Sequence, residues 1–450
     1  MRSRLRGFPA RLLLLVALAL AIRWIAVFAH YGDLPLELDD NYAYHTQAKL
    51  LLDHGGFYEP FVWRDSINAG GPEVLEPSAG HPPGYVLYLA AFGVVGLDSS
   101  LSNRLASGIA GAAAVALIGI AARRVGQWAR LGDQGADRAG LLAAFLAAIY
   151  PNLWINDALI LSESLYAGLT ALVILAAYQF WRRPSLRTSA LLGLTVGVAT
   201  LTRSEGLLLL PGLVLPLAVV LRDRTWAQRA GLAVSTGLVA LALMAPWMIR
   251  NAATFEEPSP PFLATGSGRV LAFGNCDETY SGRFLGYWNI DCAPSEFSGD
   301  ESEIDTIHRE KATAYMEDHL GELPEVALAR VGRMWHLFRV DQGVEFDRFF
   351  ERRVESHARF ALLQYYLMVP VAVAAVVLLW RRKVTIIPLV APFVLVTFTA
   401  ASTFGITRYR VPSEVALCIL AGLGVAWVIG RRTTGEAEAE AVPDADPVPA

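Results

Sequence analysis

Long apolar blocks recur along this chain, separated mostly by short arginine-containing stretches. The blocks are about 15 to 22 residues long, the length that an α-helix needs to cross a bilayer core of about 30 Å. Of the 450 residues, 54% are hydrophobic and only 18% are charged, whereas a soluble protein carries about 25% charged residues. The pattern predicts an all-α polytopic membrane protein. The arginines lie between the blocks rather than on one element, so we expect no nucleic-acid binding.

Ten blocks are predicted to be transmembrane helices. They are Leu12–Phe28, Asn103–Ala122, Gly140–Trp154, Leu165–Trp181, Leu191–Leu201, Gly206–Leu221, Gly231–Met248, Phe360–Trp380, Val384–Ala401 and Pro412–Ile429. The first block follows several arginines, as in a signal peptide. No small-residue cleavage pattern comes after it, so we interpret it as an uncleaved span.

The arginine-rich loops predict the orientation. With ten spans and a cytoplasmic N-terminus, every basic short loop and the C-terminus fall on the cytoplasmic side, in agreement with the positive-inside rule. A further span at Pro83–Val95 would invert the later loops, so that segment is predicted to be a surface or re-entrant helix. We therefore expect a multi-pass protein of the bacterial cytoplasmic (inner) membrane with both termini inside.

Two long loops then face the outside, at about residues 30–102 and 251–357, and both are expected to contain juxtamembrane helices. Residues 1–432 form one predicted transmembrane domain. The Ala/Glu/Pro-rich tail 433–450 has no apolar face and is predicted to be a disordered cytoplasmic segment.

Three cysteines are present. Cys418 lies in the last predicted span and is expected to be a buried thiol. Cys276 and Cys292 share the second outer loop, where oxidation is permitted, so a disulfide is favoured over two unpaired thiols. No set of Cys and His residues has zinc-site spacing.

Paired carboxylates follow the first span, at Asp39 and Asp40. Such a pair can supply a general base and a partner that orients substrate; the structural alternative is capping of the following helix. His81 opens a His-Pro-Pro-Gly-Tyr segment that ends at Tyr85. His81 is a candidate contact for a substrate hydroxyl or phosphate, and a solvated turn is the alternative.

Further charged residues lie at the outer ends of the third to sixth spans. Asp157 and Glu163 flank one outer turn, where Glu163 is either a functional acid or a first-turn helix stabiliser. Arg203 and Glu205 occupy a very short turn between two apolar blocks. Arg203 either holds a lipid phosphate or snorkels and pairs with Glu205. A charged pair so close to lipid is costly, which favours a functional role.

Two arginines also precede the last span on the outer side, Arg408 and Arg410. Their position runs against the positive-inside bias, and an anionic ligand such as a lipid phosphate would account for them.

The order of these motifs resembles the GT-C superfamily of membrane glycosyltransferases, which includes protein mannosyltransferases, lipid A aminoarabinose transferases and the catalytic subunit of oligosaccharyltransferase. The segments that carry the resemblance are Asp39-Asp40-Asn41-Tyr42, Pro82-Pro83-Gly84-Tyr85, Tyr150-Pro151 through Ser162-Glu163, Leu201 to Gly206, Pro246 to Asn251, the region Glu310–Leu323 with Trp335, and Arg408 to Pro412. The chain departs from the family pattern at Asp40, where Glu is commoner, at Ser204, where Pro is usual, and at Gly84, where Leu is common.

The resemblance implies transfer of a hexose or pentose from a polyprenyl-phosphate donor to an acceptor outside the membrane, with inversion. By position, Asp39 is the expected general base and Asp40 its partner in acceptor binding. Arg408, with Arg203 second, is expected to bind the lipid phosphate. No essential cofactor or metal is expected; relatives that use lipid diphosphates employ a divalent metal, for which Glu163 or Asp157 would be the candidate ligands.

Two other classes of function remain open from the sequence: a transporter or lipid flippase, and a non-catalytic membrane scaffold. Transporters tend to show repeated halves and broken helices near mid-membrane, and neither is visible here. The glycosyltransferase hypothesis predicts that Asp39, Glu163, Arg203 and Arg408 converge on one outward cavity that reaches the lipid. A scaffold would leave them dispersed, and a transporter would show a pathway open to both sides.

Overall fold

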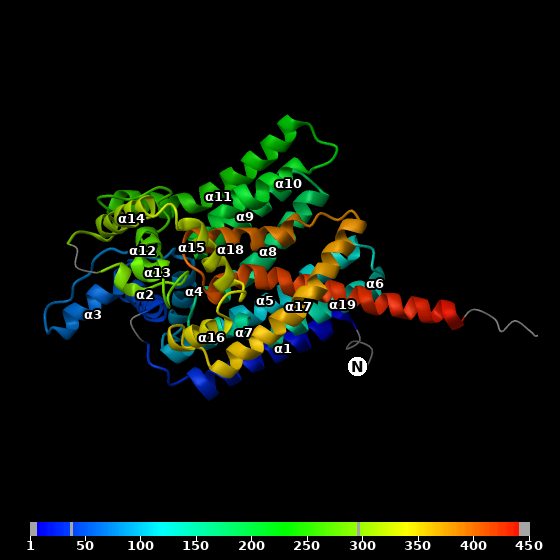
Figure 1. Cartoon of the computed structure of the whole chain (residues 1–450), viewed down its shortest axis with the longest axis horizontal. Coiled ribbons are helices and arrows are strands. Elements are labelled where there is room, and N and C mark those ends of the chain that lie inside the picture. Colours follow the sequence, from blue (N-terminus) through cyan, green and yellow to red (C-terminus); the bar gives the residue numbers. More distant parts are fainter. Residues whose placement is uncertain (1–6, 37–38, 295–297, 441–450) are drawn as a thin grey trace, which may run out of the picture.

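The computed structural model describes residues 7–36, 39–294 and 298–440, the last ten as backbone alone. Figure 1 shows long helices running side by side and shorter helices gathered at one end. The α-helices, and the 3₁₀ or π segments marked η, are α1 (Phe8–Ala26), η2 (Val27–Tyr31), α2 (Asp40–His54), α3 (Pro60–Asn68), α4 (Gly84–Gly93), α5 (Ser100–Trp128), α6 (Gly132–Ile149), α7 (Pro151–Ala158), α8 (Glu163–Arg182), α9 (Leu186–Thr202), η3 (Ser204–Leu208), η4 (Leu210–Val214), α10 (Leu215–Val219), α11 (Trp226–Thr254), α12 (Ser267–Phe273), α13 (Asp277–Tyr280), η5 (Ile290–Cys292), α14 (Glu301–Asp318), α15 (Leu323–Met334), α16 (Val340–Phe349), α17 (Glu355–Arg381), α18 (Ile387–Ser402), η6 (Thr407–Arg410) and α19 (Val411–Glu440). The described residues contain no β-strand.

Six helices are long and apolar enough to cross a membrane, and the bent pair α6 and α7 makes a seventh. Three shorter apolar helices, α9, η3 to α10, and α18, occupy the positions of three further predicted spans. The all-α polytopic architecture is confirmed, while the total of ten spans stays a prediction.

Helix α4 lies where the sequence predicts a surface or re-entrant element. Its ten residues extend only about 15 Å at 1.5 Å per residue, too short to cross the bilayer. At its start, a Cβ on Gly84 would lie 2.7 Å from the carbonyl oxygen of Leu201. Glycine at position 84 therefore lets α4 begin directly against the C-terminal end of α9.

Helix α19 is buried within the bundle, and small residues permit the close packing around it. A Cβ on Gly422 would lie 2.6 Å from the carbonyl oxygen of Ala139 on α6, and one on Gly140 would lie 2.7 Å from that of Gly119 on α5. Close backbone approach of this kind is how transmembrane helices gain contact where lipid offers no hydrophobic driving force. The bundle thus holds the outer end of α19, with η6 before it, in a fixed position.

Helix α19 continues to Glu440, whereas the sequence analysis predicts disorder from Thr433 onward. The alternating Ala and Glu of residues 436–440 are strong helix formers, so they extend a helix that is already nucleated. Residues 441–450 of the predicted tail lie outside the described residues.

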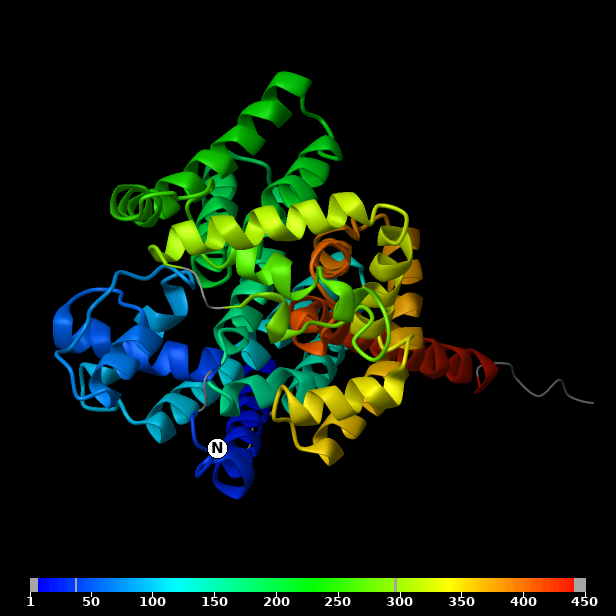
Figure 2. The ribbon, with the colours of Figure 1, turned by 60° about the vertical axis from the view of Figure 1, so that its left-hand side comes forward.

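The outer loops form a layer over one end of the bundle. Figure 2 shows α14 lying across this end, with residues 40–93 (blue) to one side. Asp300 caps α14 by accepting hydrogen bonds from the backbone N–H groups of Ser302 and Glu303. The next residue, Glu301, accepts a 2.7 Å hydrogen bond from the N–H of Ala79. The second outer loop therefore holds the first one in place beside His81.

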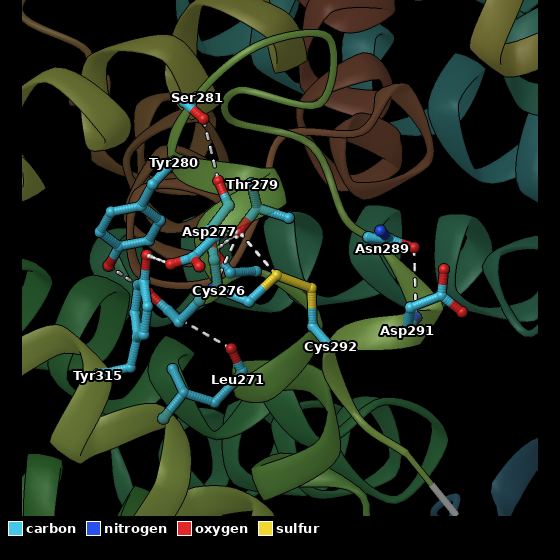
Figure 3. Close-up of a disulfide and its surroundings, with 12 residues drawn as sticks. Leu271, Cys276, Asp277, Thr279, Tyr280, Ser281, Asn289, Asp291, Cys292 and Tyr315 are labelled. Atoms are coloured by element: carbon cyan, nitrogen blue, oxygen red, sulfur yellow. Dashed lines mark hydrogen bonds between the residues drawn. A yellow bond between two sulfur atoms is a disulfide. The ribbon is translucent and has the colours of Figure 1, made fainter.

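The two cysteines of the second outer loop are joined. Cys276 and Cys292 form a disulfide with their Cα atoms 5.8 Å apart (Figure 3). Cys418 is a buried free thiol in α19.

Candidate active site

Arg408 lies at the centre of a charged cluster at the end of the bundle that carries the two long loops. It belongs to η6, immediately before α19. Its guanidinium contacts Asp40 at 2.6 Å, Glu163 at 2.9 Å and Glu351 at 3.6 Å. Three segments far apart in sequence, the start of α2, the start of α8 and the loop before α17, therefore meet at one arginine.

Arg203 extends the cluster. It is the residue at which α9 ends, and its guanidinium pairs with both Glu163 and Glu205. The side chain of Glu163 is only 2% exposed, and it bridges Arg203 to Arg408. A buried carboxylate is tolerated only where it is paired and hydrogen-bonded, which two guanidinium groups supply here.

The two adjacent aspartates have different roles in the structure. Asp39 is the N-cap of α2, because its carboxylate accepts a 3.0 Å hydrogen bond from the N–H of Asn41. Desolvation and the negative charge of Asp40 raise the pKa of Asp39 to about 6. Burial acts to raise the pKa of Asp40 as well, but Arg408 and His81 outweigh it and hold that pKa well below its usual range. Asp39 is thus the stronger base, and Asp40 stays ionised.

His81 and two tyrosines border the aspartates. The Nε2 atom of His81 lies 3.4 Å from Asp40, and its ring packs on Tyr44 with centroids 4.5 Å apart. The Tyr44 hydroxyl donates to Ser162 Oγ at 3.1 Å. Tyr85 lies behind Tyr44, fully buried and hydrogen-bonded to Ser107 at 2.6 Å. Tyr85 therefore supports the site from behind and does not line it.

Arg410, a sequence candidate for phosphate binding, lies away from the cluster. Its side chain is buried, pairs with Glu414 at 2.6 Å and lies 3.0 Å from Nδ1 of His336. A 3₁₀ helix turns 120° per residue, so Arg408 and Arg410, two residues apart in η6, point in different directions. Only Arg408 faces the site.

Asp157, a sequence candidate for metal binding, also lies elsewhere. It forms a buried ion pair with Arg23 of α1 at 2.6 Å, so its charge is already compensated. Glu163 is bound by two arginines. These two carboxylates do not fit a metal site. Among the described residues, the set with metal-ligand spacing is Cys276, Glu278 and Cys292, whose sulfurs are joined in the disulfide.

Glu351 was not predicted from sequence. Its side chain is 8% exposed and faces Arg408, and burial raises its pKa even though Arg408 and Arg353 lower it. The available signal was a charged run, Glu351-Arg352-Arg353, shortly before the predicted span at 360–380. Every other charged candidate was recognised by its place at an outer span end, and this run shares that place.

An apolar groove adjoins the cluster within the bundle. It has a cavity volume of about 30 Å³ and is lined by residues of α8, η4 and α18, among them Tyr166, Leu213 and Leu395, with Glu205 also on its wall. Because Glu205 also pairs with Arg203, the groove and the charged cluster share a wall.

Several of the residues singled out from the sequence lie close together. Glu163, Arg203 and Arg408 are linked by direct ion pairs, and Asp40 joins them through Arg408. Asp39 adjoins Asp40 and lies within the electrostatic reach of Arg408. Asp39, Asp40, Glu163, Arg203 and Arg408 therefore lie together, whereas Arg410 and Asp157 lie elsewhere.

Comparison with known proteins agrees with this geometry. Residues 80–249, fewer than half of the chain, match the family described as dolichyl-phosphate-mannose-protein mannosyltransferase. Among proteins of curated function, none matches the chain in sequence.

Solved structures align with a larger part of the chain than the family does. The archaeal oligosaccharyltransferase AglB from Archaeoglobus fulgidus, in complex with an inhibitory peptide and a dolichol-phosphate, aligns with a TM-score of 0.53 and 13% identity over 97% of this chain and 52% of that one. The same organism's oligosaccharyltransferase in complex with Zn and sulfate aligns with a TM-score of 0.53 and 14% identity, over 95% of this chain and 50% of that one. ArnT from Cupriavidus metallidurans bound to undecaprenyl phosphate aligns with a TM-score of 0.40 and 17% identity over 95% of this chain and 79% of that one.

The chain spans about half the length of the archaeal structures. At this identity the likeness establishes the fold. The GT-C architecture predicted from the motifs is confirmed at that level, and the chain is a multi-pass membrane protein.

Proposed function

We propose that the protein is a membrane glycosyltransferase that moves a hexose or pentose from a polyprenyl-phosphate donor to an extracytoplasmic acceptor: a cell-envelope glycan, lipid or protein. The observation that carries the proposal is the meeting of Arg203, Arg408 and Asp40 beside an apolar groove. A lipid-linked sugar phosphate has the matching parts, an apolar chain and an anionic head. The match of residues 80–249 to a family that uses dolichyl-phosphate-mannose supports the same donor class.

We place the lipid chain of the donor at this groove, whose volume of about 30 Å³ requires the lining helices to separate as the chain enters. The groove lies between α8, η4 and α18, and its wall carries Glu205, the partner of Arg203. A chain inside the groove would present its phosphate to Arg203 and Arg408. A guanidinium binds phosphate through charge-assisted, often paired hydrogen bonds.

The arginines are already paired, so the phosphate has to compete. Four carboxylates, from Asp40, Glu163, Glu205 and Glu351, surround two guanidinium groups. Asp40 is half-buried, whereas the side chain of Glu163 is almost fully buried. The phosphate therefore displaces Asp40 more readily than Glu163. Release of Asp40 from Arg408 frees it to bind the acceptor.

Asp39 supplies the general base. Its pKa of about 6 leaves it ionised at neutral pH and more basic than an ordinary carboxylate. The acceptor hydroxyl attacks the anomeric carbon while its proton passes to Asp39. The bond from that carbon to the phosphate oxygen breaks, and polyprenyl phosphate leaves, with inversion at the carbon. Arg408 and Arg203 stabilise the charge that develops on the phosphate, and no metal takes part in this scheme.

The proposed site lies on the outer side of the bacterial cytoplasmic membrane, with both termini inside. The arginine-rich loops support this orientation. Asp39, Asp40 and His81 belong to the loop of residues 30–102, which this orientation places outside.

Analysis of lipid-linked sugars in a deletion strain tests the proposal. We expect the donor to accumulate and a surface modification to disappear. The wild-type gene and an Asp33→Asn variant, which alters an exposed aspartate of the same loop, should restore both, and Asp39→Asn should restore neither. Unchanged lipid-linked sugars in the deletion strain would refute the donor assignment, and full complementation by Asp39→Asn would remove Asp39 from its role.

A further inference from the structure

The disulfide closes a loop that lies directly against the segment leading to Arg408. Figure 3 shows Cys276 at the start of α13 bonded to Cys292 at the end of η5. Within the loop, the carbonyl oxygen of Gly286 accepts a 3.0 Å hydrogen bond from the N–H of Gly405. Gly405 lies three residues before Arg408, so the loop contacts the backbone that enters η6.

Two buried arginines of α15 hold the loop and its flank. Arg333 donates to the carbonyl oxygens of Leu285, at 2.5 Å, and Arg283, at 2.9 Å. Arg330 donates to the carbonyl oxygen of Gly274, just before the loop, and to that of Ala401 on α18. Both side chains are at most 5% exposed.

These arginines have no carboxylate partner among the residues that the structure describes. The charge on each is compensated by oxygen dipoles and by aromatic rings, Tyr280 for Arg330 and Tyr287 for Arg333 among them. A buried cation is costly unless such hydrogen bonds are kept. The position of the loop on α15 is therefore strongly determined.

The contact between the loop, α15 and Gly405 leaves no room for side chains. A Cβ on Gly405 would overlap the carbonyl oxygen of Arg330. Gly286 has φ of +74°, and a Cβ there would lie 2.7 Å from the carbonyl carbon of Ala329. Beside them, Tyr287 of the loop belongs to an apolar cluster with Phe404 and Ile406. The backbone of the loop therefore contacts the backbone of α15 and of the segment before η6 directly. Displacement of the loop would displace the start of η6 as well.

We propose that the loop Cys276–Cys292 is a positioning element for Arg408, and that its disulfide makes binding of the donor phosphate depend on the oxidising outer side of the membrane. The proposal rests on the donor class proposed above. Opening the disulfide gives the loop more conformations, so the Gly286–Gly405 hydrogen bond is populated less. Arg408 then adopts its binding geometry less often.

The experiment compares full-length protein in detergent with a Cys276→Ser/Cys292→Ser double variant. Two quantities are measured: the Kd for undecaprenyl phosphate, and hydrogen exchange of the peptide that covers residues 403–410. We expect faster exchange and a Kd weakened by about 10 to 100-fold, which corresponds to a binding-competent geometry populated about 1 to 10% of the time. The control is Cys418→Ala, which removes the buried thiol of α19 and should change neither quantity.

A Gly405→Ala variant with the disulfide intact gives a second test if the double variant does not fold. It should show the same two changes. Unaltered exchange over residues 403–410 in the folded variants would overturn the positioning role. Faster exchange with an unaltered Kd would overturn the link to donor binding. Faster exchange in a protein whose wild type does not bind undecaprenyl phosphate would support the positioning role and count against the proposed donor.

Discussion

Asp39 and Asp40 show how strongly the surroundings separate two chemically identical neighbours. Arg408 and His81 hold the pKa of Asp40 well below its usual range, while desolvation and Asp40 raise the pKa of Asp39 to about 6. A general base works only when ionised, and the ionised fraction falls about tenfold per pH unit below the pKa. We therefore expect kcat/KM to fall about tenfold per pH unit below about pH 6.

The measurement is the rate of sugar transfer between pH 4.5 and pH 8, with thermal unfolding recorded across the same range to show that the fold persists. Asp33→Asn should keep the profile of the wild type. A rate that stays level down to pH 5 in folded protein would argue against Asp39 as the base.

Removal of Arg410 should mainly lower the stability of the protein, and removal of Arg408 should mainly weaken the binding of lipid phosphate. Arg410→Ala leaves Glu414 buried without its partner, and an uncompensated buried charge costs about 3 to 5 kcal/mol of stability. Arg408→Ala also costs stability, because Glu163 and Glu351 are buried partners of Arg408, but it in addition removes hydrogen bonds worth about 1.5 to 3 kcal/mol to a charged ligand. We expect a large drop in Tm for Arg410→Ala, and a weakening of undecaprenyl phosphate binding of about 10 to 100-fold for Arg408→Ala.

Both variants are compared by thermal unfolding and lipid-phosphate binding. Unchanged affinity in Arg408→Ala, with a drop in Tm like that of Arg410→Ala, would show that Arg408 is only structural.

At the scale of elements, α14 fixes the segment that carries His81. Glu301 accepts hydrogen bonds from the N–H of Ala79 at 2.7 Å and from the hydroxyl of Ser78 at 3.3 Å. From the other side, Arg250 of α11 donates to the carbonyl oxygen of Ser78 at 2.9 Å. This contact gives a structural reason for the arginine in the Pro246 to Asn251 segment, which from the sequence carries only the family resemblance.

Glu301→Ala should loosen that segment. Loss of the partner of a buried N–H costs about 1 to 3 kcal/mol, so we expect faster hydrogen exchange over residues 76–84 and a lower Tm. Glu310→Ala removes an exposed glutamate of the same helix and serves as the control. Equal exchange in the two variants would show that α14 does not hold the first outer loop.

What the sequence could predict follows from the physics of the whole molecule. A lipid bilayer forces apolar helices of a fixed length and sorts arginine between the two sides. The outer ends of spans were therefore predictable, and with them the convergence of Glu163, Arg203 and Arg408. The membrane puts no such constraint on the second outer loop. The charged run at Glu351 lies near a span end, but which of its residues faces Arg408 depends on tertiary packing, which no periodicity reveals.

The sequence also could not predict the direction in which individual side chains point. Arg408 and Arg410 look alike in a motif, and only the 3₁₀ geometry of η6 separates them. From the sequence, Asp157 is a candidate acid at the outer end of a span. In the structure, the bend between α6 and α7 places it inside the bundle, where it pairs with Arg23.

The orientation of the whole molecule is the premise of the proposed chemistry. Figure 1 shows α2, α3 and α12 to α14 at one end of the long helices, and the start of α1 and the far end of α19 at the other. The arginine-rich connections, such as the one between α5 and α6, predict that this second end faces the cytoplasm. Two neutral, exposed helix positions can report on the two sides, Ala314 on α14 and Gln134 on α6.

We expect a membrane-impermeant maleimide to label Ala314→Cys in intact spheroplasts, and to label Gln134→Cys only after the membrane is opened. The native cysteines are a disulfide and a buried thiol, so they contribute little background. Labelling of Gln134→Cys alone in intact spheroplasts would reverse the orientation. Asp39 and Arg408 would then face the cytoplasm, where the Cys276–Cys292 disulfide would be reduced, and both the extracytoplasmic acceptor and the oxidised loop would have to be abandoned together.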